Sequence, residues 1–132
     1  MATLISKQIS IPIQNTAKKV YAFASNPKNL PKWASGLGRP IKKIGGKWIA
    51  NSPMGKIAIQ FAQKNTFGVL DHKVTLSSGK KFSNPMRVFP NKDGSEVVFT
   101  LYRQPRMSDN EFRKDAKWIE NDLKKLKKLM EK

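Results

Sequence analysis

The last 25 residues of the chain constrain its fold most, because their pattern predicts one long amphipathic helix. Ser108 is followed three positions later by Glu111, which is the capping-box pattern that begins a helix. The residues after Ser108 form one apolar stripe at spacings of three and four, made of Phe112, Ala116, Ile119, Leu123, Leu126 and Met130. A helix of about 24 residues spans roughly 36 Å. It can therefore cross a whole sheet.

Most of the chain before this helix is predicted to form strands. Near the N-terminus, Ile9, Ile11 and Ile13 alternate with polar residues, which is typical of a strand with one buried face. Pro12 indicates that this strand is an edge or that it ends there. Six further strands are separated by turn residues and are expected at 40–44, 47–51, 56–64, 69–77, 81–90 and 95–104.

Two short helices complete the predicted fold, at 16–25 after the capping residues Asn15 and Thr16, and near 28–34. We therefore predict one α+β domain over residues 1–132, in which a curved seven-stranded antiparallel sheet carries two short helices and the long C-terminal helix on one side. A strongly bent sheet cannot close completely onto one helix. We expect the remaining gap to be a pocket, a usual place for an apolar ligand.

Several local strings point to a known family, namely VYAFASNPKNLPKW at 20–33, FGVLDHKV at 67–74, NPMRVFPN at 84–91 and SEVVFTLYRQPRMSDNEF at 95–112. Over essentially its whole length the chain resembles the START-like or birch-pollen-allergen-like superfamily, also called SRPBCC, and its bacterial polyketide cyclase/dehydrase-like members. The resemblance implies the helix-grip fold with a cavity between sheet and long helix. Members bind lipids, hormones or polyketides, some catalyse cyclisation or dehydration, and others act on partner proteins, so function does not follow from the fold alone.

The composition excludes several kinds of chemistry. The chain has no cysteine, which removes disulfides, thiolate nucleophiles and cysteine-ligated zinc. With His72 as the single histidine, we expect neither a zinc nor a haem site, and no cofactor. The N-terminus lacks the basic region and apolar run of a signal peptide, and no segment approaches the roughly 18 apolar residues of a membrane span. We therefore expect a cytoplasmic protein.

His72 is the one candidate catalytic residue. In its predicted strand, Leu70, His72, Val74 and Leu76 share the more apolar face, whereas Asp71 lies on the other face. If the apolar face is concave, the imidazole can orient a ligand or act as a general base. The alternative is a histidine hydrogen-bonded in the core or at the cavity rim. Asp71 is expected to pair with a lysine on the convex face, so no serine-type triad is predicted.

The candidate ligand-binding residues are large apolar side chains and three polar ones. Arg87 and Arg103 either face the cavity, where each can bind a carboxylate or phosphate, or point outward. Asn84 either binds a ligand carbonyl or satisfies the backbone beside Pro85. The apolar candidates line the pocket or simply fill the core, and they are Trp33, Phe61, Phe67, Phe82, Met86, Phe99 and Tyr102. The family resemblance places Trp33 at the tunnel entrance.

On composition alone, the net charge of +17 suggests an anionic partner such as nucleic acid or a membrane surface. Residues 1–107 carry 18 Lys and Arg against three acids, so the excess lies outside the lysine-rich C-terminus. No arginine-rich run or nucleic-acid motif accompanies it. We therefore rank binding of a small hydrophobic or amphipathic molecule first, a cyclase or dehydratase that uses His72 second, and anionic-surface binding third. We expect a monomer or a weak homodimer.

Overall fold

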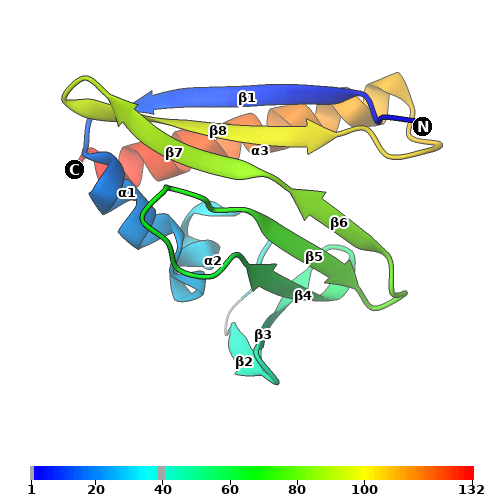
Figure 1. The fold of residues 1–132 in the computed structure, drawn as a ribbon. Coiled ribbons are helices and arrows are strands. Elements are labelled where there is room, and N and C mark those ends of the chain that lie inside the picture. Colours follow the sequence, from blue (N-terminus) through cyan, green and yellow to red (C-terminus); the bar gives the residue numbers. More distant parts are fainter. Residues whose placement is uncertain (1, 39–40) are drawn as a thin grey trace.

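A computed structural model describes residues 2–38 and 41–132, and shows two antiparallel sheets beside one long helix (Figure 1). The first sheet has the strand order β1-β8-β7, with β1 at Ser6–Ile13, β8 at Gly94–Tyr102 and β7 at Met86–Asn91. The second has the order β2-β3-β4-β5-β6, with strands Lys42–Ile44, Lys47–Ser52, Gly55–Phe61, His72–Leu76 and Lys81–Asn84. The α+β class is confirmed.

The prediction of a single seven-stranded sheet was wrong, because the expected strand at 81–90 is divided at Pro85. Proline has no N–H for the ladder, and here it separates β6, which pairs with β5, from β7, which pairs with β8. The carbonyl of Pro85 still accepts a hydrogen bond from the N–H of Thr100, 2.9 Å away. The expected strand at 40–44 is observed from Lys42 onward, and its residue 40 lies outside the described residues.

Residues 68–71 connect the two sheets. The predicted strand at 69–77 begins only at His72, and the residues before it cross to β7. The N–H of Leu70 donates to the carbonyl of Met86 at 2.8 Å, and the N–H of Val88 donates to the carbonyl of Gly68 at 2.9 Å. This crossing brings the start of β5 beside β7, although the two strands belong to different sheets.

The helices begin where the capping residues predicted. The helix α1 spans Ala17–Ala24, and the hydroxyl of Thr16 accepts from the N–H of Lys19 at 3.2 Å. A short 3₁₀ turn, η1, at Pro27–Asn29 leads into α2 at Leu30–Trp33. The long helix α3 spans Asp109–Met130, and the hydroxyl of Ser108 accepts from the N–H of Glu111 at 3.1 Å.

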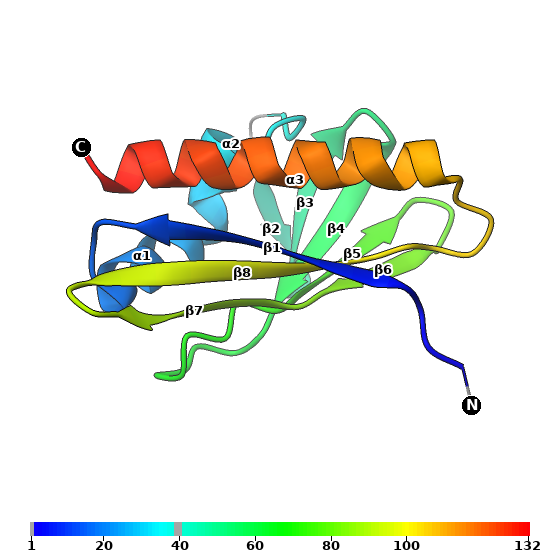
Figure 2. The same cartoon turned by 90° about the horizontal axis from the view of Figure 1, so that it is seen from above.

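The apolar stripe of α3 packs on the three-stranded sheet, and Figure 2 shows the helix running along β1 and β8. Ala116, Leu123 and Leu126 are buried there and belong to one core cluster. The same cluster contains Ile57 and Ile59 of β4, so the inner faces of both sheets and α3 enclose a common interior. No helix within the described residues is long and apolar enough to cross a membrane.

Candidate functional site

His72 lies at the start of β5 with its ring turned toward the interior. The ring centroid is 5.1 Å from that of Phe61 on β4 and 6.0 Å from that of Phe99 on β8. Phe61 is opposite His72 in the β4–β5 register, which explains the shorter of these distances. Phe99 is buried in the core cluster. His72 therefore joins the five-stranded sheet to the three-stranded one through an aromatic contact.

The surroundings of His72 keep its ring neutral. Its Nδ1 lies 3.0 Å from the carbonyl oxygen of Leu70, and because a carbonyl can only accept, Nδ1 carries the proton of the neutral ring. Burial lowers the pKa of His72 below 6.5, outweighing the Leu70 carbonyl and the charge of Asp71, which both raise it. Among the described residues Nε2 has no hydrogen-bond partner. It is therefore available as an acceptor at neutral pH.

Trp33 ends α2 and places an unpaired donor in the interior. Its side chain is only 5% exposed, and its indole Nε1 is buried without a hydrogen-bond partner among the described residues. An indole nitrogen can only donate, and an unsatisfied buried donor costs about 1–3 kcal/mol. The family resemblance led us to expect Trp33 at an entrance. Instead, it packs inside the core cluster, because α2 lies against α3.

The remaining candidate residues have different environments. Met86 is fully buried in the core cluster. Phe61 is partly buried and packs against this cluster, and Tyr102 is half-buried. Phe82 is half-buried beneath the ammonium of Lys80, which lies 5.3 Å from the ring centroid. Asn84, also half-buried, is opposite His72 in the β5–β6 register.

Phe67 does not line the interior, since it is 82% exposed. Asn65 explains this placement because its carbonyl oxygen accepts from the backbone N–H groups of Phe67 and Val69, both at 3.0 Å. Its amide also donates to the carbonyl of Val69 at 3.0 Å. These bonds hold the connection between β4 and β5 in a tight loop that directs Phe67 outward.

Arg87 points away from the interior, contrary to a role inside the cavity. Its Nε and a terminal nitrogen donate to the two carboxylate oxygens of Asp71 at 3.0 and 2.8 Å, and its side chain is 51% exposed. Asp71 therefore pairs with an arginine rather than with the predicted lysine. The Arg87 guanidinium holds the pKa of Asp71 below its usual range, helped by the N–H of Met86, which donates to Asp71 at 2.9 Å.

Arg103 supports the turn between β8 and α3. Its Nε donates to the carbonyl of Met107 at 3.0 Å, and its guanidinium pairs with Asp109 at the start of the helix. These contacts engage Nε and one terminal nitrogen of the guanidinium within the turn. Arg87 is thus on the outer surface and Arg103 lines the groove beside residues 3–5, and no contact joins either arginine to His72 among the described residues.

A buried carboxylate on α3 was missed by the sequence analysis. Asp122 is 6% exposed and accepts hydrogen bonds from the backbone N–H and the hydroxyl of Ser35. Burial raises the pKa of Asp122, against the opposing effect of the Ser35 bonds. The indole of Trp118 donates to the carbonyl of Ser35 at 3.2 Å. The signal was present, because Asp122 is three residues from Ile119 and four from Leu126, within the apolar stripe.

Two open grooves lie on the surface of the described residues. One, of about 330 Å³, runs between β1 and α3, and the other, of about 410 Å³, lies between residues 3–5 and the turn at 103–107. His72, Phe61 and Phe99 line neither of them. Side chains of the core cluster occupy the interior around these three residues, so a ligand there requires some of them to move.

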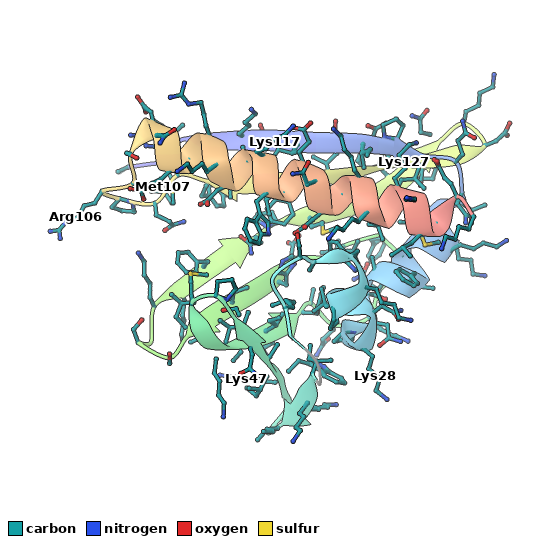
Figure 3. All side chains as sticks on the ribbon, turned by 180° about the vertical axis from the view of Figure 1, so that it is seen from behind. Lys28, Lys47, Arg106, Met107, Lys117 and Lys127 are labelled. Atoms are coloured by element: carbon teal, nitrogen blue, oxygen red, sulfur yellow. The ribbon has the colours of Figure 1, made fainter. Side chains whose placement is uncertain are left out.

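The positive charge is dispersed over the molecule. Of the cations labelled in Figure 3, Lys117 and Lys127 lie on α3, Arg106 lies in the turn before it, and Lys28 and Lys47 lie on η1 and β3. Within residues 2–38 and 41–132, no three side chains of His, Asp or Glu gather closely enough to hold a metal ion. The labelled cations therefore do not form a single patch. The described residues also contain no cluster that could bind a metal ion.

Comparison with known proteins identifies the architecture. No protein-family model matches this chain, and no curated protein sequence matches it. Solved structures do. The Aha1 dimer of Colwellia psychrerythraea is similar with a TM-score of 0.76 at 16% identity, over 97% of each chain. The KanY protein has a TM-score of 0.76 at 13% identity, over 99% of this chain and all of its own.

A third similar structure is DynU16, a protein of the dynemicin biosynthetic locus. It has a TM-score of 0.72 at 11% identity, over 96% of this chain and 47% of its own. Identities this low show a common fold and nothing finer. Two of these three structures match over nearly their whole length, so the arrangement of sheets and helices seen here recurs in other proteins.

Proposed function

We propose that the chain binds a small apolar or amphipathic molecule in the interior between the five-stranded sheet and α3, as a helix-grip protein of the SRPBCC type. The observation that carries the proposal is the buried indole N–H of Trp33, which has no acceptor among the described residues. Buried polar groups are nearly always paired, and an exception calls for an explanation. A ligand carbonyl or hydroxyl supplies the missing acceptor.

The neutral His72 supports the same proposal. Its Nε2 offers an acceptor and the indole of Trp33 offers a donor, within a protein core that consists mainly of apolar side chains. A few polar groups within a mainly apolar lining are typical of small-molecule sites. The ligand class we infer has an apolar body with at least one hydrogen-bond acceptor.

Entry of the ligand requires side chains to move aside. Phe61, Val74 and Leu76 are only partly buried on the inner face of the five-stranded sheet, and Met86 of the core cluster against which they pack is an unbranched, adaptable side chain. These residues can be displaced at smaller cost than a fully buried branched side chain. The origin of DynU16 in a biosynthetic locus supports a small organic molecule as the occupant.

Catalysis is a second candidate function, favoured by His72 alone. A neutral imidazole held through Nδ1, with Nε2 unoccupied, has the arrangement of a general base for a polyketide-like substrate. Asp71, the adjacent acid, points to Arg87 on the outer face and does not assist it. Binding therefore ranks above turnover. Binding of an anionic surface ranks third, because no arginine-rich run or nucleic-acid motif accompanies the net charge of +17.

Binding of neutral aromatic probes tests the first proposal without interference from the basic surface. We would measure displacement of N-phenyl-1-naphthylamine fluorescence by 2-acetylnaphthalene, which has an acceptor, and by 2-ethylnaphthalene, which has a similar shape without one. Replacing Trp33→Phe is expected to weaken the ketone about two- to tenfold, the worth of one hydrogen bond. The hydrocarbon should be nearly unaffected.

The half-buried Trp48 provides the matched control, since Trp48→Phe should change neither affinity. Circular dichroism of each variant would establish that it is folded. Absence of saturable probe binding to the unmodified protein would show that the interior is only a packed core. Equal ketone affinity with and without Trp33 would show that the indole N–H does not bind the ligand, which would also contradict the proposal.

A further inference from the structure

Within residues 2–38 and 41–132, the strand β1 is an open edge of the three-stranded sheet, because it pairs with β8 alone. In an antiparallel pair, alternate residues direct their backbone groups toward the partner strand. The N–H of Arg103 donates to the carbonyl of Ile5 at 2.8 Å, so the odd-numbered residues of β1 face β8. The even-numbered residues from Ser6 to Pro12 therefore direct their N–H and C=O groups away from the sheet.

The C-terminal half of this edge is closed by α3. The ammonium of Lys127 donates to the carbonyl of Pro12 at 2.8 Å, and Pro12 has no N–H of its own. Just beyond the strand, the N–H of Gln14 donates to the carboxylate of Glu131 at 2.8 Å. Glu131 and Lys127 also pair with each other at 2.6 Å. One ion pair thus occupies the outward backbone groups at this end.

The N-terminal half is open. Ser6, Gln8 and Ser10 are exposed, and their outward N–H and C=O groups have no partner among the described residues. Three consecutive outward residues offer the hydrogen bonds of a short added strand. In Figure 1, β1 borders the sheet along its whole length with no further strand beside it.

The groove between β1 and α3 lies along this open half. Its floor is apolar, formed by Ile9 and Ile11 of the strand and by Ala116 and Leu123 of the helix. Side chains alternate along an extended chain, so a strand laid on the edge can place every second side chain toward this floor. The volume of about 330 Å³ accommodates small apolar side chains.

The rim of the groove is basic. Lys7 and Lys124 line it together with Glu120, whose carboxylate is already paired with Lys124 at 3.1 Å and Lys117 at 3.8 Å. A second copy of this chain also carries a net charge of +17, so pairing of two such edges is opposed by repulsion. An acidic partner is attracted by the same charges.

We propose that the open half of β1 binds an extended acidic segment of a partner protein by strand addition. Backbone bonds to Ser6, Gln8 and Ser10 hold the segment, acidic side chains contact Lys7 and Lys124, and apolar side chains enter the groove. Lysine and proline on an edge strand usually prevent pairing. Here Pro12 acts only in the closed half, and the lysines select the charge of the partner.

A peptide with alternating glutamate and valine, blocked at both ends and ten residues long, is the probe for this site. We expect its addition to ¹⁵N-labelled protein to shift the amide resonances of Ser6, Gln8 and Ser10 and to slow their hydrogen exchange. A peptide with lysine in place of glutamate should not bind. Failure of the acidic peptide to bind at about 1 mM, the weak limit of specific recognition, would overturn the proposal.

Replacement of Gln8→Pro separates strand addition from mere charge attraction. Proline removes the outward N–H of residue 8, which makes no bond to β8, so the sheet itself should be preserved as it is at Pro12. The acidic peptide should bind about two- to tenfold more weakly, the worth of one backbone hydrogen bond. Gln8→Ala retains the N–H and should bind like the unmodified protein. Equal binding by both variants would exclude strand addition.

Charge reversal tests the basic rim. Lys7→Glu combined with Lys124→Glu should weaken the acidic peptide about tenfold at low salt, and this difference should shrink at high salt. Lys28→Glu combined with Lys47→Glu is the matched control, because it changes the net charge equally and Figure 3 shows both lysines away from α3, on η1 and on the five-stranded sheet. An equal loss of affinity in the control would mean that peptide binding depends on the total charge of the protein and not on this groove.

Discussion

At the residue scale, the chemistry of two side chains depends on contacts that the strand pattern does not show. The strand pattern placed His72 on a face with Leu70 and Val74, and its ring does face the interior, against Phe61. The pattern could not reveal that the Leu70 carbonyl binds Nδ1, which selects the tautomer. Similarly, Asp71 pairs with Arg87 because the two sheets meet there, whereas the strand pattern led to the expectation of a lysine on the convex face.

The lowered pKa of His72 predicts how stability depends on pH. Below about pH 7 the unfolded chain, with the ordinary pKa of 6.5, takes up a proton that the folded state resists, so the free energy of unfolding falls as pH falls. Replacing His72→Leu should remove this loss, which cannot exceed about 1.4 kcal/mol per pH unit. Urea unfolding at pH 7.5 and 5.5 measures it. An identical decrease in both proteins would contradict the burial of the ring.

At the element scale, the helices follow from local signals and the strands less fully. The cap at Ser108 and the stripe after it are contacts within a few residues, so they were readable from the chain. Pro85 was equally visible, but whether it ends one strand or merely marks an edge depends on the strands beside it. Asp122 was overlooked because its hydrogen-bond partner, Ser35, lies far away in the sequence. Without that partner, a carboxylate within an apolar stripe has no evident role.

Removing the cap of α3 should destabilise the whole protein. Ser108→Ala eliminates the hydroxyl that accepts from the N–H of Glu111, and the expected loss is about 1 kcal/mol, within a range of roughly 0.5–2. Denaturant unfolding measures it. Asn110→Ala, at an exposed neighbouring position without a side-chain bond among the described contacts, is the control and should be nearly neutral. Equal effects would show that the cap contributes nothing beyond helix propensity.

At the scale of the whole molecule, the connection at residues 68–71 unites the two sheets into one body. Gly68 lies so close to β7 that a Cβ added to it would be 1.9 Å from the carbonyl oxygen of Val88. Its own carbonyl accepts from the N–H of Val88. The hydrogen bond between Leu70 and Met86 follows immediately, and the pair of Asp71 and Arg87 covers the junction. Glycine is therefore required here by contact as well as by conformation.

Two glycine substitutions distinguish contact from conformation. Gly68 and Gly79 both have positive φ, of 74° and 90°, so alanine at either position incurs about 1–2 kcal/mol of left-handed strain. Nothing lies within 4 Å of a Cβ at Gly79. Gly68→Ala should lower the free energy of unfolding by several kcal/mol more than Gly79→Ala, because the backbone of β7 must shift. Calorimetry would compare the two, and equal losses would refute a tight junction between the sheets.

The amino-acid sequence by itself determined the α+β class, the positions of the helices and most strand segments, and the scarcity of catalytic groups. These properties depend on periodicity, caps and turns, which act between residues close in the chain. Only the tertiary structure decided that the strands divide into three and five. It also decided that, among the described residues, the N–H of the buried Trp33 has no acceptor and half of β1 has no partner strand. These features depend on register and packing between distant segments, where each side chain's surroundings are supplied by residues that no local pattern brings together.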